Sequence, residues 1–389
     1  MATSHLLNQW LTTVALDEPH KLDRRLKWDG LDPAEFETWL KTDGFDNDPS
    51  GSQWLGGLET IRAALQKHWQ LPLLPYQADC QWPFQDIWWP VRLELERWLS
   101  HELGSIAGMG IAVFADLAEA LLDRLCSISE PLLWNCFCQG RGPGAMLLAH
   151  LGAEGDDSGA PVRELYEQFV KQHRRDGLAS LLADYPMFGR LIGQVVNLWK
   201  IASVELLERV RNDRPALENT FGIPQAAQLV AVKQGLSDPH RGGRAVAILS
   251  FADSTNNTAL QVVYKPKDMG VDAAYQALLA DLNANSSLEP LRTLAVHTGE
   301  GYGYMEFVAH QLCESDDHLH SFYTNAGRLA ALLHLLGCTD CHHENLIASS
   351  DQLLLIDTET LLEADLPDHI RQADSAAADV GLSNLGTRF

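Results

Sequence analysis

Two cysteines, two histidines and several carboxylates lie within one short stretch of the sequence, CTDCHHENLIASSDQLLLIDTE, which runs from Cys338 to Glu359. Thiolates and imidazoles are ligands that zinc prefers, whereas carboxylate and amide oxygens suit magnesium, and a carboxylate can also act as a general base. The stretch therefore allows two kinds of chemistry: a metal-binding knot, or a loop that transfers phosphate.

The metal interpretation depends on Cys338 and Cys341, a C-x-x-C pair followed by two histidines. A structural zinc site needs a second pair of ligands at a suitable spacing, and none follows. Cys136 and Cys138 form a distant C-x-C pair that only the fold could bring close. The spacing favours two small thiols beside a helix end. A metal-dependent hydrolase that uses this cluster remains an alternative, and it predicts stoichiometric zinc.

The phosphate interpretation depends on Asp340 and Asn345, which are five residues apart in a loop after a predicted helix. The catalytic Asp and the metal-binding Asn of protein kinases have the same offset. Asp357 follows a predicted hairpin, as the second magnesium-binding Asp of kinases does. Asp340 would accept the proton of an attacking hydroxyl group, and Asn345 and Asp357 would hold Mg²⁺. Glu359 would share that work if the strand continues, because alternate residues face the same side.

Phosphate transfer from ATP also needs a cation on an upstream strand. Lys265, in VVYKPK, ends a predicted strand and can bind a phosphate, although a strand-end lysine can also be merely structural. Gly242 and Gly243 would let the backbone approach phosphate, with Arg244 beside them. YMEFVA would connect two lobes and hold an adenine.

The elements that must position these residues change in character along the chain. The first half has the apolar spacing of helices, and the predicted helices cover 32–45, 89–103, 105–122 and 187–213. After Pro224, segments rich in β-branched residues predict strands. We expect a hairpin over 244–267, a helix over 272–285, a strand over 301–309, a helix over 321–337 closed by Gly337, and a hairpin over 345–359.

Composition excludes several classes of protein. The chain has 389 residues and a formal net charge of -23, which makes nucleic acid an unsuitable partner. No signal peptide is visible, and the most apolar stretch, 105–122, is interrupted by Asp116 and Glu119, so it predicts a buried helix and not a membrane span. Seven cysteines without framework spacing indicate free thiols in a reducing cytoplasm.

Several ordered motifs resemble the dehydratase domain of class II lanthipeptide synthetases, the LanM enzymes. The resemblance covers about residues 95–365 and includes DYPMFGRLI, DPHRGGRAVAILSF, VVYKPK, GYGYMEFV, FYTNAGRLAALLHLLGCTDCHHENLIA and LLLIDTETLL. It implies an α+β fold: a mostly helical N-terminal half, then a lipid-kinase-like core of two lobes. The expected domains are a helical region over 1–222, an N-lobe over 223–310 and the start of a C-lobe over 311–389.

The resemblance also implies a reaction and its partners. These enzymes use ATP and Mg²⁺ to phosphorylate Ser and Thr in the core of a precursor peptide that carries a leader, and then eliminate the phosphate to leave dehydroamino acids. Carried over, Lys265 would bind ATP phosphate and His342 would support the loop that holds the base. Asp238 and His240 match a pair that is tied to elimination.

The chain also departs from the family pattern. Cys341 stands where the loop usually has leucine, and neither the later Arg and Thr motif nor a zinc-bearing cyclase domain is recognisable. We therefore expect an N-terminal portion of a synthetase, a truncated product or a split component, with an incomplete second lobe and with the remaining synthetase or cyclase part as a candidate partner. The alternative is a non-catalytic remnant that binds the precursor or a partner synthetase.

Overall fold

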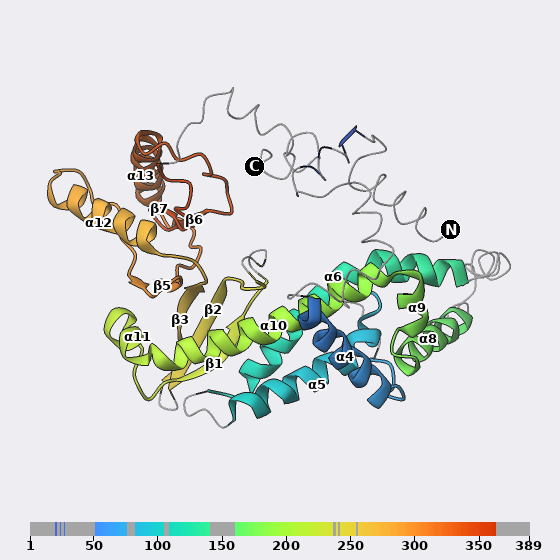
Figure 1. Ribbon diagram of the computed structural model, residues 1–389. Helices are drawn as coiled ribbons and strands as arrows, with labels where there is room; N and C mark the ends of the chain where they lie inside the picture. Colours follow the sequence, from blue (N-terminus) through green and yellow to red (C-terminus); the bar gives the residue numbers. More distant parts are fainter. Residues whose placement is uncertain are drawn as a thin grey trace. The chain divides into compact units, whose positions relative to one another are not determined.

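The computed structural model describes residues 20, 21, 24, 27, 51–75, 82–104, 109–140, 160–235, 239, 242–253 and 256–362 (Figure 1). They form two compact units, which we describe one at a time. The sheet unit contains Gln53–Gly270 and Leu294–Phe307, and the hairpin unit contains Val271–Thr293, the described residues from Val308 onward and the few described residues before Gln53. No helix in the described part of the chain is long and apolar enough to cross a membrane.

Long helices make up the first part of the sheet unit. In α10, Pro186 lies in the first turn, where its fixed φ suits a helix start, and apolar residues recur every three or four positions on the buried face. The helices are α4 Gly51–Lys67, α5 Gln85–Leu103, α6 Ala112–Gly140, α8 Ala160–Arg175, α9 Ala179–Asp184, α10 Pro186–Asn212 and α11 Arg214–Phe221.

The predicted helices over 89–103 and 187–213 are confirmed as α5 and α10. The apolar stretch over 105–122 enters α6 at Ala112, and its side chains Val113, Leu117 and Leu121 are buried as predicted. The helix predicted over 32–45 lies outside the described residues.

Buried tryptophans join the helices through both packing and hydrogen bonds. Trp88 on α5 is fully buried, and its ring nitrogen donates to Oγ of Ser129 on α6 at 2.8 Å. The ring nitrogen of Trp199 on α10 donates to the main-chain oxygen of Leu117 at 2.9 Å. Because each indole N–H is paired, these rings enter the core without an unpaired polar group.

A five-stranded antiparallel sheet follows the helices, in the order β1-β2-β3-β5-β4. The predicted hairpin over 244–267 is confirmed as β2 and β3, and the predicted strand over 301–309 as β5; the sequence did not predict β1 or β4. The strands are β1 Gln228–Lys233, β2 Ala247–Asp253, β3 Asn256–Lys265, β4 Val296–Thr298 and β5 Gly303–Glu306. The mixed α+β class is confirmed.

The outer edge of β1 is covered by the segment that leads into α6. Gly110 donates to the main-chain oxygen of Leu229 at 2.8 Å, and the main-chain nitrogen of Val232 donates to the carboxylate of Asp116 at 2.9 Å. An edge strand otherwise presents unpaired N–H groups to other chains. Asp116, one of the charged residues that interrupt the apolar stretch, thus pairs a main-chain N–H group on the edge of β1.

The hairpin unit contains two helices and a two-stranded hairpin, all close to their predicted positions. Its apolar core joins α12 and α13 to the second strand, and the buried members are Tyr275, Leu279, Leu329, Leu333 and Leu355. The elements are α12 Gly270–Ala284, α13 Asp316–Leu335, β6 Leu346–Ser349 and β7 Gln352–Leu355.

Asn325 fixes the hairpin on α13. Its side chain is fully buried and donates to the main-chain oxygen of Asp351 at 2.9 Å, within the two-residue turn between β6 and β7. Ser350 in the same turn has φ 56°, the positive value that tight hairpin turns require at a central position. The main-chain groups of Gln311 also bond to Ala348 and Ser350. The turn between β6 and β7 is therefore held both by α13 and by the segment that precedes α13.

Candidate functional site

The loop that carries Asp340 begins at a capped helix end. Gly337 has φ 61° and donates to the main-chain oxygen of His334, while Cys338 donates to that of Leu333. This pair of bonds is the Schellman motif, which ends a helix with a left-handed glycine. The main-chain nitrogen of Leu362 also donates to Leu336 at 2.8 Å. Both ends of the segment that contains the loop and the hairpin thus meet at the end of α13.

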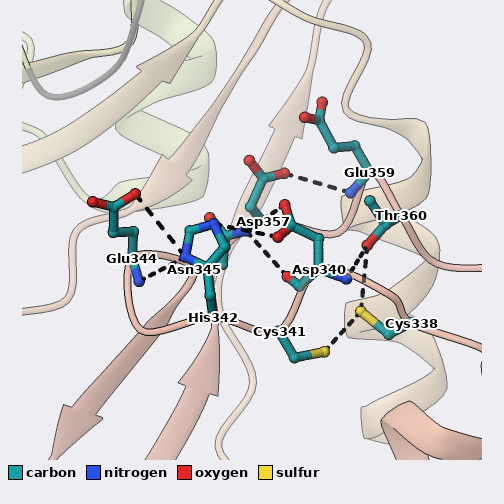
Figure 2. A network of polar contacts seen from close by, with 9 residues as sticks. All are labelled: Cys338, Asp340, Cys341, His342, Glu344, Asn345, Asp357, Glu359 and Thr360. Atoms are coloured by element: carbon teal, nitrogen blue, oxygen red, sulfur yellow. Dashed lines mark hydrogen bonds and ion pairs between the residues drawn. The ribbon is translucent and has the colours of Figure 1, made fainter. Parts of the chain in front are cut away.

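Asp340 and Asn345 lie against each other in this loop (Figure 2). The amide nitrogen of Asn345 donates to Oδ2 of Asp340 at 3.0 Å and to its main-chain oxygen at 3.1 Å. With the nitrogen engaged there, the amide oxygen is the remaining polar atom of that side chain. The main-chain oxygen of Asn345 accepts from Ile356 at 2.9 Å, which ties the loop to the segment after β7.

His342 contacts the other oxygen of Asp340. Its Nε2 lies 3.2 Å from Oδ1 of Asp340, and its Nδ1 accepts from the main-chain nitrogen of Glu344 at 3.1 Å. An accepting Nδ1 places the proton of a neutral ring on Nε2, which then donates to the carboxylate. Each oxygen of Asp340 thus has a polar partner, Asn345 for Oδ2 and His342 for Oδ1, while about a third of the side chain (32%) stays exposed. A carboxylate with this support keeps lone pairs for a further donor.

Thr360 supports the main chain of the same loop. Its Oγ1 accepts from the main-chain nitrogen of Asp340 at 3.2 Å and lies 3.5 Å from Sγ of Cys338. Cys341 donates from its Sγ to that of Cys338 at 3.0 Å. Burial, followed by the contact with Cys338 and the charge of Asp340, raises the pKa of Cys341 to about 12. Sequence reasoning missed Thr360, since a threonine after the hairpin gives no signal of its own.

Asp357 and Glu359 follow β7 in an irregular segment. β7 ends at Leu355, so the alternation expected to place both carboxylates on one side does not reach them. Instead, the main-chain nitrogen of Glu359 donates to Oδ1 of Asp357 at 3.4 Å, and the Glu359 carboxylate points away from Asp340 (Figure 2). Between them, Thr358 is fully buried and its hydroxyl oxygen has no hydrogen-bond partner.

The predicted metal ligands supply hard oxygens but do not form a closed cage. Within the described residues, no group of three or more His, Cys, Asp or Glu side chains is arranged to hold an ion. Magnesium commonly binds through one or two carboxylates together with phosphate oxygens and water. The amide oxygen of Asn345 and the carboxylate of Asp357 fit that partial role. The Cys338 and Cys341 pair does not provide the four ligands of a structural zinc site.

Lys265 and Arg244, the predicted phosphate contacts, lie in the sheet unit. Lys265 is the last residue of β3, opposite Gly303 on β5, and is 6% exposed. A lysine is rarely buried to this extent unless its charge is paired. Asp238 and His240 lie outside the described residues.

Arg244 is engaged by α10. Its guanidinium donates to both carboxylate oxygens of Glu205, which also pairs with Arg209. Burial acts to raise the pKa of Glu205, but the hydrogen bonds from Arg244 and the charges of both arginines outweigh it and lower that pKa. This contact was not visible in the sequence, because the two residues are far apart along the chain.

The chain matches one protein family and one known protein. The family described as "Domain of unknown function (DUF4135)" matches residues 185–388, more than half of the chain. The lacticin 481/lactococcin biosynthesis protein LcnDR2 of Lactococcus lactis subsp. lactis is 22% identical over 216 residues, which cover 52% of this chain and 22% of that protein. The chain therefore spans about a fifth of the length of this relative. It belongs to the DUF4135 family, the domain of the N-terminal dehydratase region of LanM lanthipeptide synthetases.

Proposed function

We propose that the chain phosphorylates Ser and Thr side chains of a lanthipeptide precursor peptide with ATP and Mg²⁺, and takes part in eliminating the phosphate to leave dehydroamino acids. One observation carries the proposal: in a chain related to a lacticin biosynthesis protein, Asp340 is supported on both oxygens by Asn345 and His342. A general base needs such orientation, because misplacement by about 1 Å can reduce a rate about 100-fold.

Each residue has a proposed role in phosphorylation. Asp340 accepts the proton of the attacking hydroxyl group, and His342 holds its carboxylate in place. Asn345 and Asp357 offer oxygens to Mg²⁺, with Glu359 assisting through the segment that it shares with Asp357. Bound ATP would supply the phosphoryl group, and the ion would neutralise charge on it.

The remaining site residues would act on the nucleotide and on the second step. Lys265 binds an ATP phosphate, since an ammonium held at a buried strand end is positioned before the nucleotide arrives. Arg244 would contact phosphate beside the glycines of its loop while it stays paired with Glu205. Asp238 and His240 serve elimination, which needs a base for the α-proton and stabilisation of the departing phosphate.

This function is consistent with a lipid-kinase-like core, with lobes over 223–310 and 311–389 after a helical region over 1–222. The proposed partners are the precursor peptide, through its leader and core, and the remaining part of a synthetase. Dependence on ATP assigns the reaction to the cytoplasm under this proposal.

The test is incubation of the full chain with ATP, Mg²⁺ and a leader-bearing lanthipeptide precursor, followed by mass spectrometry. A gain of phosphate supports the kinase step, and a loss of water supports elimination as well. Asp340→Asn keeps the size of the side chain and should abolish the phosphate gain. The matched control is Glu314→Gln, which removes an exposed charge elsewhere in the hairpin unit and should leave activity unchanged.

Peptide binding without any mass change would reject the kinase proposal and favour the alternative, a non-catalytic protein that binds the precursor. Phosphorylation that persists in Asp340→Asn would reject the assignment of the base. If Asp238→Ala and His240→Ala do not cause phosphorylated peptide to accumulate, the second step has been assigned to the wrong residues.

A further inference from the structure

The loop that carries Asp340 contains two thiols in direct contact. Sγ of Cys341 lies 3.0 Å from Sγ of Cys338, about 1 Å longer than a disulfide bond. Both residues are partly exposed, so a small reagent can reach this region of the loop. The two residues between them are Thr339 and Asp340, so a bond between the sulfurs would close a covalent ring that includes the main chain of Asp340.

The C-x-C pair of Cys136 and Cys138 differs in geometry from this C-x-x-C pair. Cys136 and Cys138 lie on α6, and residues two positions apart on a helix do not face each other. In the loop pair, the helix has already ended, and Cys341 directs its S–H at Cys338. Closure therefore requires movement of a loop and not the unwinding of a helix.

The geometry points to Cys338 and Cys341 as a redox modification site, which is oxidised by a small-molecule disulfide such as glutathione disulfide to an intrachain disulfide bond. Cys338 accepts the hydrogen bond from Cys341, and burial together with that contact keeps Cys341 protonated by raising its pKa. Cys338 is therefore the first nucleophile and Cys341 the resolving thiol.

The exchange balances in two steps. The Cys338 thiolate attacks one sulfur of the small disulfide, whose S–S bond breaks; a mixed disulfide forms and one thiolate leaves. Cys341 gives its proton to that thiolate and attacks the sulfur of Cys338, which releases the second small molecule as a thiolate that takes a proton from water. Two protein thiols are oxidised, and one small disulfide is reduced to two thiols.

Formation of the disulfide would change the position of Asp340, because Cys338 and Asp340 both contact Thr360 in the reduced form. Sγ of Cys338 lies beside Oγ1 of Thr360, and the same oxygen accepts from the main-chain nitrogen of Asp340. Drawing the sulfurs together pulls on the main chain on both sides of Asp340. This consequence rests on the proposed function: the oxidised chain should phosphorylate peptide more slowly than the reduced chain, by about tenfold or more.

The bond itself is tested without any assay of activity. The reduced full chain is equilibrated with mixtures of glutathione and glutathione disulfide, alkylated, and digested with trypsin. The peptide from Leu329 to Arg371 contains Cys338 and Cys341 and no other cysteine. We expect this peptide to lose two hydrogens and escape alkylation, and to regain both thiols with dithiothreitol. Full alkylation, or glutathione attached to Cys338 without ring closure, would overturn the proposal.

Variants separate this pair from the other cysteines. Cys341→Ser should stop the reaction at the mixed disulfide on Cys338, whereas Cys136→Ser should leave ring closure unchanged. The rate of peptide phosphorylation is then compared between reduced and oxidised chains. The double variant Cys338→Ser/Cys341→Ser should phosphorylate peptide at the same rate under reducing and oxidising conditions. If the reduced chain lacks kinase activity, the proposed function fails while the peptide map still decides the disulfide. Equal activity of an active chain in both states would overturn the regulatory consequence.

Discussion

The side-chain amide nitrogen of Asn345 donates two hydrogen bonds to Asp340, one to Oδ2 of Asp340 at 3.0 Å and one to the main-chain oxygen of Asp340 at 3.1 Å. The main-chain oxygen of Asn345 also accepts from Ile356, in the segment that leads to Asp357. One residue therefore connects the proposed base with the segment that carries a proposed metal ligand. A change of its side chain removes the contacts with Asp340 and leaves the main-chain bond to Ile356 in place.

The first prediction concerns this connection. Asn345→Ala should lower phosphorylation about 100-fold or more, because it removes a proposed ligand oxygen and a donor that orients Asp340. Thermal unfolding should change little, since the side chain is only partly buried. Asn285→Ala is the matched control: it removes an amide that bonds to Asp281 at the exposed end of α12, and activity should persist. Wild-type turnover by Asn345→Ala would contradict the assignment.

The sequence predicted those elements whose signal lies within one continuous segment, and it missed those that depend on residues elsewhere in the chain. Apolar periodicity over many residues predicted α5, α10, α12 and α13, and turn residues between two apolar runs predicted each hairpin. β4 was missed because it has only three residues, and β1 and β4 are both stabilised by pairing with strands elsewhere in the sequence, β2 and β5. A window of sequence does not contain those partners.

The candidate site shows the same limit. The offset between Asp340 and Asn345 was visible in the sequence, and the structure places them in contact. The contact of Arg244 with Glu205 and that of Thr360 with Asp340 depend on segments that are distant in sequence, and no motif announces either. The role of Glu359 was argued from strand alternation, which ends with β7 at Leu355.

The second prediction concerns the pH dependence of stability through Glu205. Burial opposes ionisation, but the contacts with Arg244 and Arg209 outweigh it, so the pKa of Glu205 is lowered from its ordinary value of 4.5. A carboxylate with a lowered pKa contributes stability above its unfolded pKa, and that contribution is lost as the pH falls through the folded pKa. Glu205→Gln should therefore lower the free energy of unfolding at neutral pH, by about 2 kcal/mol.

The difference between Glu205→Gln and the wild type should shrink as the pH falls well below 4.5, as measured by urea unfolding across pH. Glu208→Gln on the same helix is the control. Glu208 is half exposed and lies 3.9 Å from Arg211, so its removal should have little effect at any pH. A pH-independent difference for Glu205→Gln would indicate that packing, and not charge, explains its contribution.

The third prediction concerns Arg174, which lies near the end of α8 and is fully buried. Its guanidinium donates to the main-chain oxygens of Asp86 and Leu71, and burial lowers its pKa. A lysine has a single nitrogen and cannot span both carbonyls as the planar guanidinium does. Arg174→Lys should therefore destabilise the chain by about 2 to 4 kcal/mol in urea unfolding.

Arg175→Lys provides the comparison for this prediction, because it makes the same substitution one residue later. Arg175 is exposed and its guanidinium lies 5.5 Å from the ring centre of Trp69, a contact that lysine can also make. Its effect should stay within about 0.5 kcal/mol. Equal stability of the two variants would show that the buried carbonyls find other donors.

The fourth prediction concerns the close approach of α4 and α10. A Cβ atom added at Gly57 would lie 2.0 Å from the main-chain oxygen of Gly193, and no side chain can yield there because the obstacle is backbone. Gly57→Ala should lower the free energy of unfolding by about 2 kcal/mol or more, since the helices must separate.

Gly56 precedes Gly57 on α4 and has no atom within 4 Å of its added Cβ. Gly56→Ala should instead stabilise the chain by about 0.5 to 1 kcal/mol through helix propensity. The two variants differ by one position and should shift the unfolding midpoint in opposite directions. A shift in the same direction would mean that propensity, and not the distance between the helices, determines the response.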